Sequence, residues 1–164
     1  MVFSTLLTIL VNKGVGEMKL STRGQYGTRA LLELALHQGE RPVLLRDIAQ
    51  RQQISLQYLE HLISPLIAGG MVRSTRGARG GVSLARTPED IRLSEVVHLL
   101  EGSVAPVKCV DNPETCVRSE LCVTRDVWGE MKQAIDGVLE STTLKDLVER
   151  QKKKEHPEAG MYYI

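Results

Sequence analysis

The chain has 164 residues, of which 42% are hydrophobic, 25% charged and 4% aromatic, and its formal net charge is +1. These values are those of a globular protein and exclude a chain too short or too polar to bury an aliphatic core. The charge is unevenly divided, because residues 18–86 carry ten Lys and Arg against four Asp and Glu, whereas residues 87–164 carry ten against fifteen. A basic front half suits a polyanionic partner, although an ordinary solvated surface explains this asymmetry equally well.

Residues 1–17 form a segment of their own. The apolar run 2–11 resembles a signal-peptide core, but no basic residue precedes it and no small-residue cleavage site follows it. It is also too short to span a bilayer, so no membrane association is expected. Because MKLSTRGQYG from Met18 looks like a natural chain start, we predict that residues 1–17 come from an upstream start codon and have no function.

Three helices are expected next. The spacing of apolar residues predicts a first helix that ends before Gly39, and a second, short helix at about 45–51. The third helix opens at Ser55, a good N-cap, and ends at the glycine pair 69–70. Pro65 within it should bend it or begin a new turn.

The second and third helices match a helix-turn-helix, which lays the start of its second helix in the DNA major groove. The candidate DNA-binding residues on that helix are Ser55, Gln57, Tyr58, Glu60 and His61. Gln suits a bidentate pair with adenine, and Ser or Tyr suits a base or phosphate contact. Two core helices without a ligand would give a similar pattern, so the motif alone does not decide.

Two strand-like pieces at 71–75 and 82–85 follow, joined by a basic, glycine-rich loop. They predict a hairpin, and a helix-turn-helix followed by a hairpin is a winged helix. Arg73, Arg76 and Arg79 are its candidate DNA-binding residues, since arginine at a wing tip suits the narrow minor groove. A nucleotide phosphate cradle is disfavoured because the loop lacks a Gly-Lys-Ser/Thr ending and no helix follows it directly.

The acidic back half is predicted to be helical. Residues 90–100 form an amphipathic helix, and Thr143 with Asp146 is an N-cap signature that opens a short final helix. Between them lies a longer helix with one broad apolar face, part of which could be core. The residues of that face are Val127, Trp128, Met131, Ile135, Val138 and Leu139.

The three cysteines of the chain, Cys109, Cys116 and Cys122, lie together in the polar stretch KCVDNPETCVRSELCVTR. An odd number cannot pair completely in intrachain disulfides, and the polar neighbours do not suit buried core cysteines. Three thiolates held close together favour a metal, and soft sulfur selects an iron-sulfur cluster, zinc or copper(I). Their spacing does not choose among these.

From Met18 to its end the chain resembles the bacterial Rrf-two family of winged-helix transcription regulators. The matching segments are MKLSTRGQYG at 18–27, ISLQYLEHLISPLIAGGMV at 54–72, RGARGG at 76–81 and STTLKDL at 141–147. The resemblance implies a mainly α fold, with a winged helix-turn-helix DNA-binding domain and a long C-terminal dimerisation helix. It also implies a cytoplasmic homodimer on a near-palindromic operator, and no enzyme activity. Val82 departs from the family, in which many members have an aromatic residue there.

These observations divide the chain into functional segments. We assign residues 18–87 to DNA binding, 88–107 to a connecting helix and 108–125 to a cysteine-rich cluster loop. Residues 126–150 hold the dimerisation helix and the short final helix, and residues 151–164 form a tail.

The resemblance also implies a cofactor. Cluster-binding members carry three cysteines at very similar spacing and typically bind a 2Fe-2S cluster, which makes Cys109, Cys116 and Cys122 the expected ligands. The fourth ligand does not carry over: Arg125 stands where the IscR-type branch has a histidine, and Gln25 where other branches have an acidic residue. The carboxylates that could substitute are Asp111, Glu114, Glu120 and Asp126.

The ending GMYYI resembles the tail of the CymR-type repressors of cysteine metabolism. By resemblance, Tyr162, Tyr163 and Ile164 would dock into cysteine synthase through the terminal carboxylate, although a disordered tail is nearly as good an explanation. The function expected is therefore a repressor or dual regulator that senses iron-sulfur or redox status. The alternatives are a CymR-like repressor controlled by cysteine synthase or thiol oxidation and, third, an iron-sulfur electron carrier.

Overall fold

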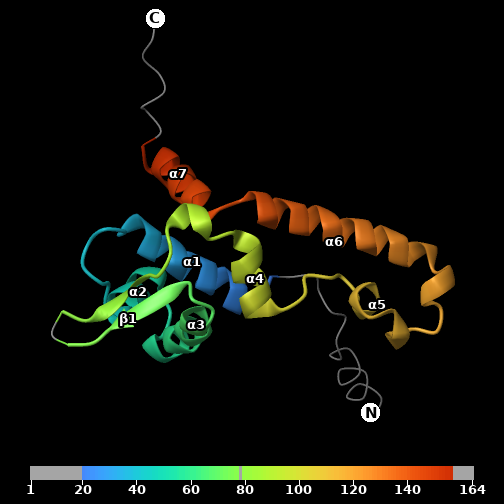
Figure 1. Cartoon of the computed structure of the whole chain (residues 1–164), viewed down its shortest axis with the longest axis horizontal. Coiled ribbons are helices and arrows are strands. Elements are labelled where there is room, and N and C mark those ends of the chain that lie inside the picture. Colours follow the sequence, from blue (N-terminus) through green and yellow to red (C-terminus); the bar gives the residue numbers. More distant parts are fainter. Residues whose placement is uncertain (1–19, 78, 157–164) are drawn as a thin grey trace, which may run out of the picture.

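The computed structural model describes residues 20–77 and 79–156. The helices in this part of the chain are α1 (Thr22–Leu36), α2 (Leu45–Gln52), α3 (Leu56–Ala68), α4 (Leu93–Glu101), α5 (Lys108–Asp111), α6 (Val123–Ser141) and α7 (Leu144–Glu155). Three 3-10 turns join them: η1 (Pro88–Asp90), η2 (Pro113–Thr115) and η3 (Ser119–Leu121). The two strands are β1 (Val72–Thr75) and β2 (Gly81–Leu84). Figure 1 shows a compact body from which α6 extends as an arm.

Helix α1 lies at the centre of the body and packs against α2, α3, α4, α7 and β2. It begins where the Ser21 hydroxyl accepts a hydrogen bond from the Arg23 backbone amide at 3.1 Å. Its inward face is aliphatic, as the low aromatic content requires. The large side chains buried in the core come from α1, α2, α3, α4, α7 and the turn before α4, and they include Leu31, Ile48, Leu59, Leu66, Ile91, Val96 and Leu144.

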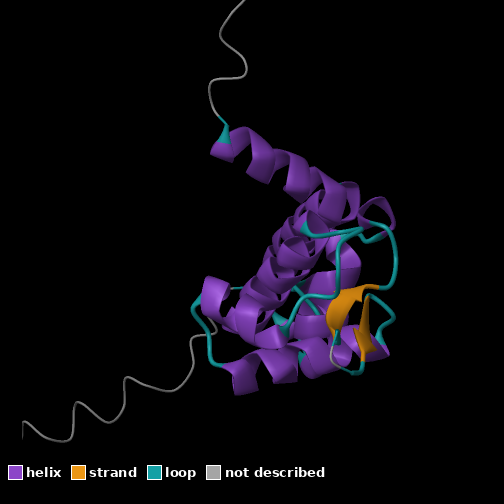
Figure 2. Ribbon diagram, turned by 90° about the vertical axis from the view of Figure 1, so that its left-hand side faces the viewer, coloured by secondary structure: helices purple, strands orange, loops and turns teal. Residues whose placement is uncertain are grey.

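Strands β1 and β2 form an antiparallel hairpin, with Val72 opposite Leu84 and Thr75 opposite Gly81. Val43, in the loop between α1 and α2, extends the sheet by exchanging backbone hydrogen bonds of 2.9 and 2.8 Å with Val82. Figure 2 shows this small sheet at one side of a helical body. The arrangement confirms the predicted mainly α winged-helix fold.

The arm α6 leaves the body near α7, and its far end carries the cysteine-containing segment and α5 (Figure 1). No residue of α6 is buried, and it contacts α4 and α5. None of the helices in the described residues has the length and the apolar run that crossing a membrane requires.

The predicted element boundaries differ from the structure in the back half. Residues 91 and 92 are extended, and backbone hydrogen bonds of 2.9 Å from Leu93 to Thr142 and from Leu144 to Ile91 hold them beside the start of α7, so α4 begins at Leu93 and later than the expected residue 90. This pairing joins positions far apart in sequence, which a local pattern cannot reveal.

In the front half, helix α3 continues past Pro65 to Ala68, so no separate turn begins at this proline.

The last two helices are longer than the sequence boundaries suggested. Helix α6 begins at Val123, inside the predicted loop 108–125, and α7 reaches Glu155, beyond the predicted limit at 150. The strong helix formers at the end of α7 and its lysines, which favour a helix C-terminus, explain that extension. The capping box of Thr143 and Asp146 is present as predicted. Residues 1–17 and the tail residues Tyr162, Tyr163 and Ile164 lie outside the described residues.

We expect Gly27→Ala to destabilise the fold. A Cβ at position 27 would lie 2.2 Å from Leu100 Cδ1, so the buried Leu100 side chain would have to shift, at about 1–3 kcal/mol in the free energy of unfolding measured with urea. The matched control is Gly137→Ala in α6, where a Cβ has open space and should be neutral or stabilising. Equal stability of the two variants would contradict the packing of Leu100 against Gly27.

Candidate DNA-binding face and cysteine loop

Helices α2 and α3 form the helix-turn-helix. The turn between them uses Gln53 in the left-handed region, at φ 54°, and α3 starts where the Ser55 hydroxyl accepts a hydrogen bond from the Tyr58 amide at 3.1 Å. One face of α3 enters the core through Leu59, Leu62, Ile63 and Leu66. The opposite face is therefore free to meet a partner.

The structure places four of the five predicted residues of this helix on the exposed face. Ser55, Gln57, Glu60 and His61 are exposed near the start of α3. Tyr58 differs, because it is half-buried and its hydroxyl donates to Thr22 Oγ1 at 3.2 Å. Its ring also packs edge-on against Tyr26, with 6.1 Å between the ring centroids. Tyr58 therefore joins α3 to α1, a role that sequence spacing could not show.

The hairpin places three predicted arginines on the solvent side of the wing. Arg73 is held by a hydrogen bond from its Nε to Ser83 Oγ at 3.0 Å, while Arg76 and Arg79 are exposed at the tip. A Cβ at Gly81 would lie 2.5 Å from the Val43 carbonyl oxygen, which explains a glycine there. Val82 is 2% exposed, so its aliphatic side chain is part of the core.

The three cysteines lie at the far end of α6. Cys109 belongs to α5, Cys116 follows η2, and Cys122 is the N-cap residue of α6. Their sulfurs are suitable donors for an iron-sulfur cluster or a soft metal, and all three residues are half-buried and unpaired. In the described residues, however, no three Cys, His, Asp or Glu side chains come together as a metal-binding group. Holding a cluster would therefore require this segment to close around it.

Arg125 braces the same segment. Its Nε donates to the Cys109 carbonyl oxygen at 2.8 Å, and its Nη1 donates to the Ser119 carbonyl oxygen at 3.3 Å. The side chain thus ties α5 and η3 to the first turn of α6. Arg125, which stands where the IscR-type branch has a histidine, therefore has a structural role here.

The thiol of Cys122 is hydrogen-bonded at the start of α6. A contact of 3.2 Å between its Sγ and the Thr124 hydroxyl, together with the backbone amide of Arg125, lowers the pKa of the Cys122 thiol. A lower pKa increases the thiolate fraction, and thiolate is the form that binds metals and reacts with oxidants. The side chains beside Cys122 are strongly exposed apolar residues, with Val117 at 104% and Leu121 at 93%.

The predicted dimerisation face of α6 is only partly covered. Val127 is 51% exposed and Val138 65% exposed, while Trp128, Met131 and Ile135 are half-buried. An apolar face left open on a projecting helix favours a partner. Dimerisation through these five residues stays a prediction.

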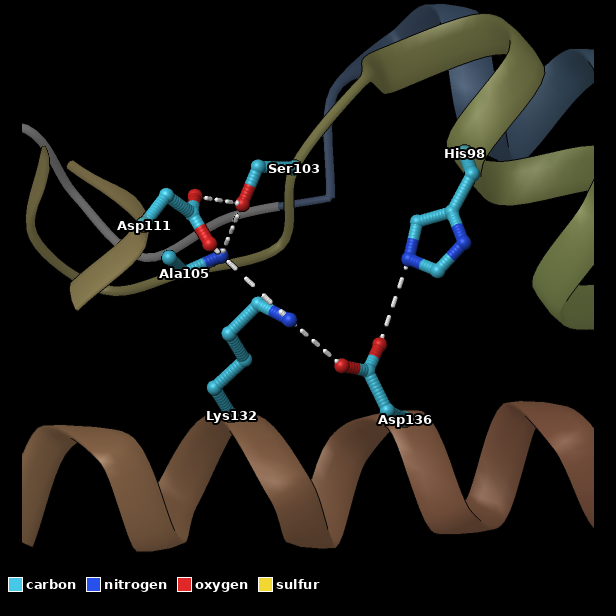
Figure 3. A network of polar contacts seen from close by, with 6 residues as sticks. All are labelled: His98, Ser103, Ala105, Asp111, Lys132 and Asp136. Carbon is cyan, nitrogen blue, oxygen red and sulfur yellow. Dashed lines mark hydrogen bonds and ion pairs between the residues drawn. The ribbon is translucent and has the colours of Figure 1, made fainter.

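A chain of polar contacts joins the arm to the body and to the cysteine segment (Figure 3). Asp136 of α6 contacts His98 Nε2 at 3.2 Å and Lys132 Nζ at 2.8 Å. Lys132 Nζ also lies 3.9 Å from the carboxylate of Asp111, to which the Ser103 hydroxyl donates. No local motif indicates this role of His98, because its partner lies on a helix that is distant in the chain.

Comparison with known proteins shows strong similarity along most of the chain. Residues 20–150 match the family described as "Rrf2: Iron-dependent Transcriptional regulator". The rrf2 protein of Nitratidesulfovibrio vulgaris is 49% identical over 131 residues, covering 80% of this chain and 87% of that protein. The regulator CymR of Bacillus subtilis is 40% identical over 147 residues, covering 90% of this chain and 100% of CymR.

The fold also matches solved structures. The structure of T. potens IscR superposes with a TM-score of 0.73 at 40% sequence identity, covering 92% of this chain and 100% of IscR. The similarity therefore includes the arm and the cysteine segment as well as the winged helix.

We expect Asp136→Asn to weaken the attachment of α6 and to change its pH dependence. The hydrogen bond from Lys132 is the main cause that holds the pKa of Asp136 below its ordinary value of 3.8, with His98 contributing. A lowered folded-state pKa stabilises the protein above the unfolded-state value, and this stabilisation is lost as the pH falls through the folded-state value. Urea unfolding between pH 7 and pH 3 should therefore show a smaller acid-induced loss of stability in Asp136→Asn than in the native protein. Identical pH profiles would contradict this ion pair.

Proposed function

The chain belongs to the Rrf2 family of transcriptional regulators, and on that premise we propose that its binding to an operator is controlled by a 2Fe-2S cluster on Cys109, Cys116 and Cys122. Members of this family are regulators and not enzymes. The observation that carries the cofactor proposal is that every cysteine of the chain lies in one segment at the end of α6. Thiolates are the usual ligands of such clusters, and the family description includes iron dependence.

The described contacts narrow the choice of a fourth ligand. Arg125 is engaged with two carbonyl oxygens, and the Asp111 carboxylate is engaged with Ser103 and Lys132. Glu114, Glu120 and Asp126 are the remaining exposed carboxylates of the segment. A protein oxygen from this group, or an exogenous ligand, is the proposed fourth donor.

The proposed route of control runs through the polar chain of Figure 3. Closing of the cysteine segment around a cluster would displace Asp111 and so disturb its contact with Lys132 of the arm. Through Asp136 of the arm, this change would reach His98 of the body. We propose that the cysteine segment has two positions and that each favours a different arrangement of the arm α6. In a homodimer, the arrangement of the two arms would set the distance between the two copies of the recognition helix α3. When bound, the cluster supplies a redox-sensitive group that stabilises one arrangement.

Protein purified without oxygen tests the cofactor. We expect a brown protein containing iron and sulfide, with visible circular dichroism that is lost in Cys109→Ala, Cys116→Ala and Cys122→Ala because each removes a ligand. Glu130→Ala, on the exposed surface of α6, is the control and should keep the spectrum. A colourless native protein after anaerobic reconstitution with iron and sulfide would exclude the cluster.

A second candidate function is a repressor controlled by thiol chemistry, as in the CymR-like alternative. The lowered pKa of the Cys122 thiol favours it, as does the alignment with the whole of CymR. Cysteine synthase as a partner of Tyr162, Tyr163 and Ile164 belongs to this candidate. A colourless protein whose DNA binding changes after mild oxidation, and is insensitive to it in Cys122→Ser, would favour this function.

For the DNA-binding face we propose base contacts from the start of α3 and minor-groove contacts from the wing. Gln57→Ala should reduce discrimination between the operator and a single-base variant by about 1–3 kcal/mol, because a bidentate base contact is lost. Arg79→Ala should weaken binding to sites with a narrow minor groove more than to others. Fluorescence anisotropy with operator duplexes measures both effects, and Lys145→Ala in α7 is the control. Unchanged operator discrimination in Gln57→Ala would contradict this use of α3.

A further inference from the structure

The first half of α1 lies directly beside the start of the recognition helix α3. The Tyr58 hydroxyl donates to Thr22 Oγ1 at 3.2 Å, and the rings of Tyr26 and Tyr58 pack at 88° to each other with their centroids 6.1 Å apart. Residues 22–29 are therefore held next to the turn of α3 that enters a DNA groove in a helix-turn-helix protein.

The first half of α1 also carries two arginines, Arg23 and Arg29. Arg29 lies over the Tyr26 ring, with its guanidinium carbon 5.2 Å from the ring centroid, and both Arg23 and Arg29 are exposed. Neither arginine forms a salt bridge within the described part of the chain. Tyr26 thus orients the Arg29 guanidinium without neutralising its charge.

The backbone at the start of α1 is already occupied. Glu101 Oε1 accepts hydrogen bonds from the Gly24 amide at 2.6 Å and from the Ser21 hydroxyl at 2.5 Å. A DNA phosphate could not take that place without displacing a carboxylate. Any anion bound by this half of α1 must therefore be bound by its side chains.

We propose that Arg23 and Arg29 form a second DNA contact, which binds the phosphodiester backbone beside the groove entered by α3. Tyr26 is a positioning residue, because it holds Arg29 against the Tyr58 side of the recognition helix. Guanidinium groups suit phosphate oxygens in charge and in geometry. The inference rests on the proposed DNA binding and adds residues that the helix-turn-helix and wing motifs did not indicate.

The chemistry predicts a particular signature. A phosphate contact contributes equally to every duplex, and its loss reduces the steepness with which the binding constant falls with salt by about 0.9 per contact. A residue with only a packing role would change stability and leave that salt dependence as it was. A base-reading residue would change operator binding more than binding to unrelated DNA.

The test uses the full-length protein and two duplexes, a mixed-sequence 30-base-pair duplex and the operator, titrated at several KCl concentrations. Arg29→Gln should lower affinity for both duplexes by the same several-fold factor and reduce the salt dependence, by about 0.9 per protomer bound. Arg29→Lys should keep most of the salt dependence. Tyr26→Leu should lower affinity for both duplexes although Arg29 keeps its charge, and Lys145→Gln in α7, which lies on the other side of the body from α3, is the charge-matched control (Figure 1).

The outcomes separate this inference from the proposed function. Failure of the native protein to bind either duplex at low salt would overturn DNA binding itself. Binding by the native protein with an unchanged salt dependence in Arg29→Gln would overturn only the second contact, and so would a loss confined to the operator. Urea unfolding of each variant accompanies the titrations, so that a folding defect in Arg29→Gln is recognised and Arg23→Gln then takes its place.

Discussion

The close approach of α4 to α1 is the constraint on which the rest of the structure depends. A Cβ at Gly24 would lie 2.4 Å from Glu101 Oε1, and one at Gly27 would lie 2.2 Å from Leu100 Cδ1. The two helices can meet so closely because α1 has no side chains at these positions. The contact fixes the end of α4, from which the cysteine segment departs, relative to the helix that supports the DNA-binding face.

The molecule has two parts, the body and the arm α6, which are held together by different interactions. The body has a dense aliphatic core and presents its arginines on the wing and on α1, so its surface suits the phosphates and grooves of DNA. The arm buries none of its residues and is attached through polar contacts among His98, Lys132, Asp136 and Asp111. An element attached by partly covered polar pairs and half-buried side chains is easier to displace than one anchored in a core, which suits a regulatory arm.

For two residues, Arg125 and Tyr58, the structure shows a role that differs from the one their sequence positions indicate. Arg125 interrupts an expected ligand set, yet it is a brace across the cysteine segment. Tyr58 has the position of a DNA-reading residue, yet its hydroxyl and ring are used to attach α3 to α1. In both cases the local motif indicated the correct region, and the long-range partner decided what the side chain does.

Sequence alone determined the elements whose signals are local. The apolar spacing of α1 and α3, the N-cap at Ser55, the capping box at Thr143 and the basic hairpin loop each depend on neighbours within a few residues, so they were predictable. The grouping of the cysteines was equally plain. Only the tertiary structure decided the late start of α4, the Tyr58–Thr22 hydrogen bond and the joining of α6 to α4 through Asp136. Each of these depends on which elements pack together, because the partners are separated along the chain.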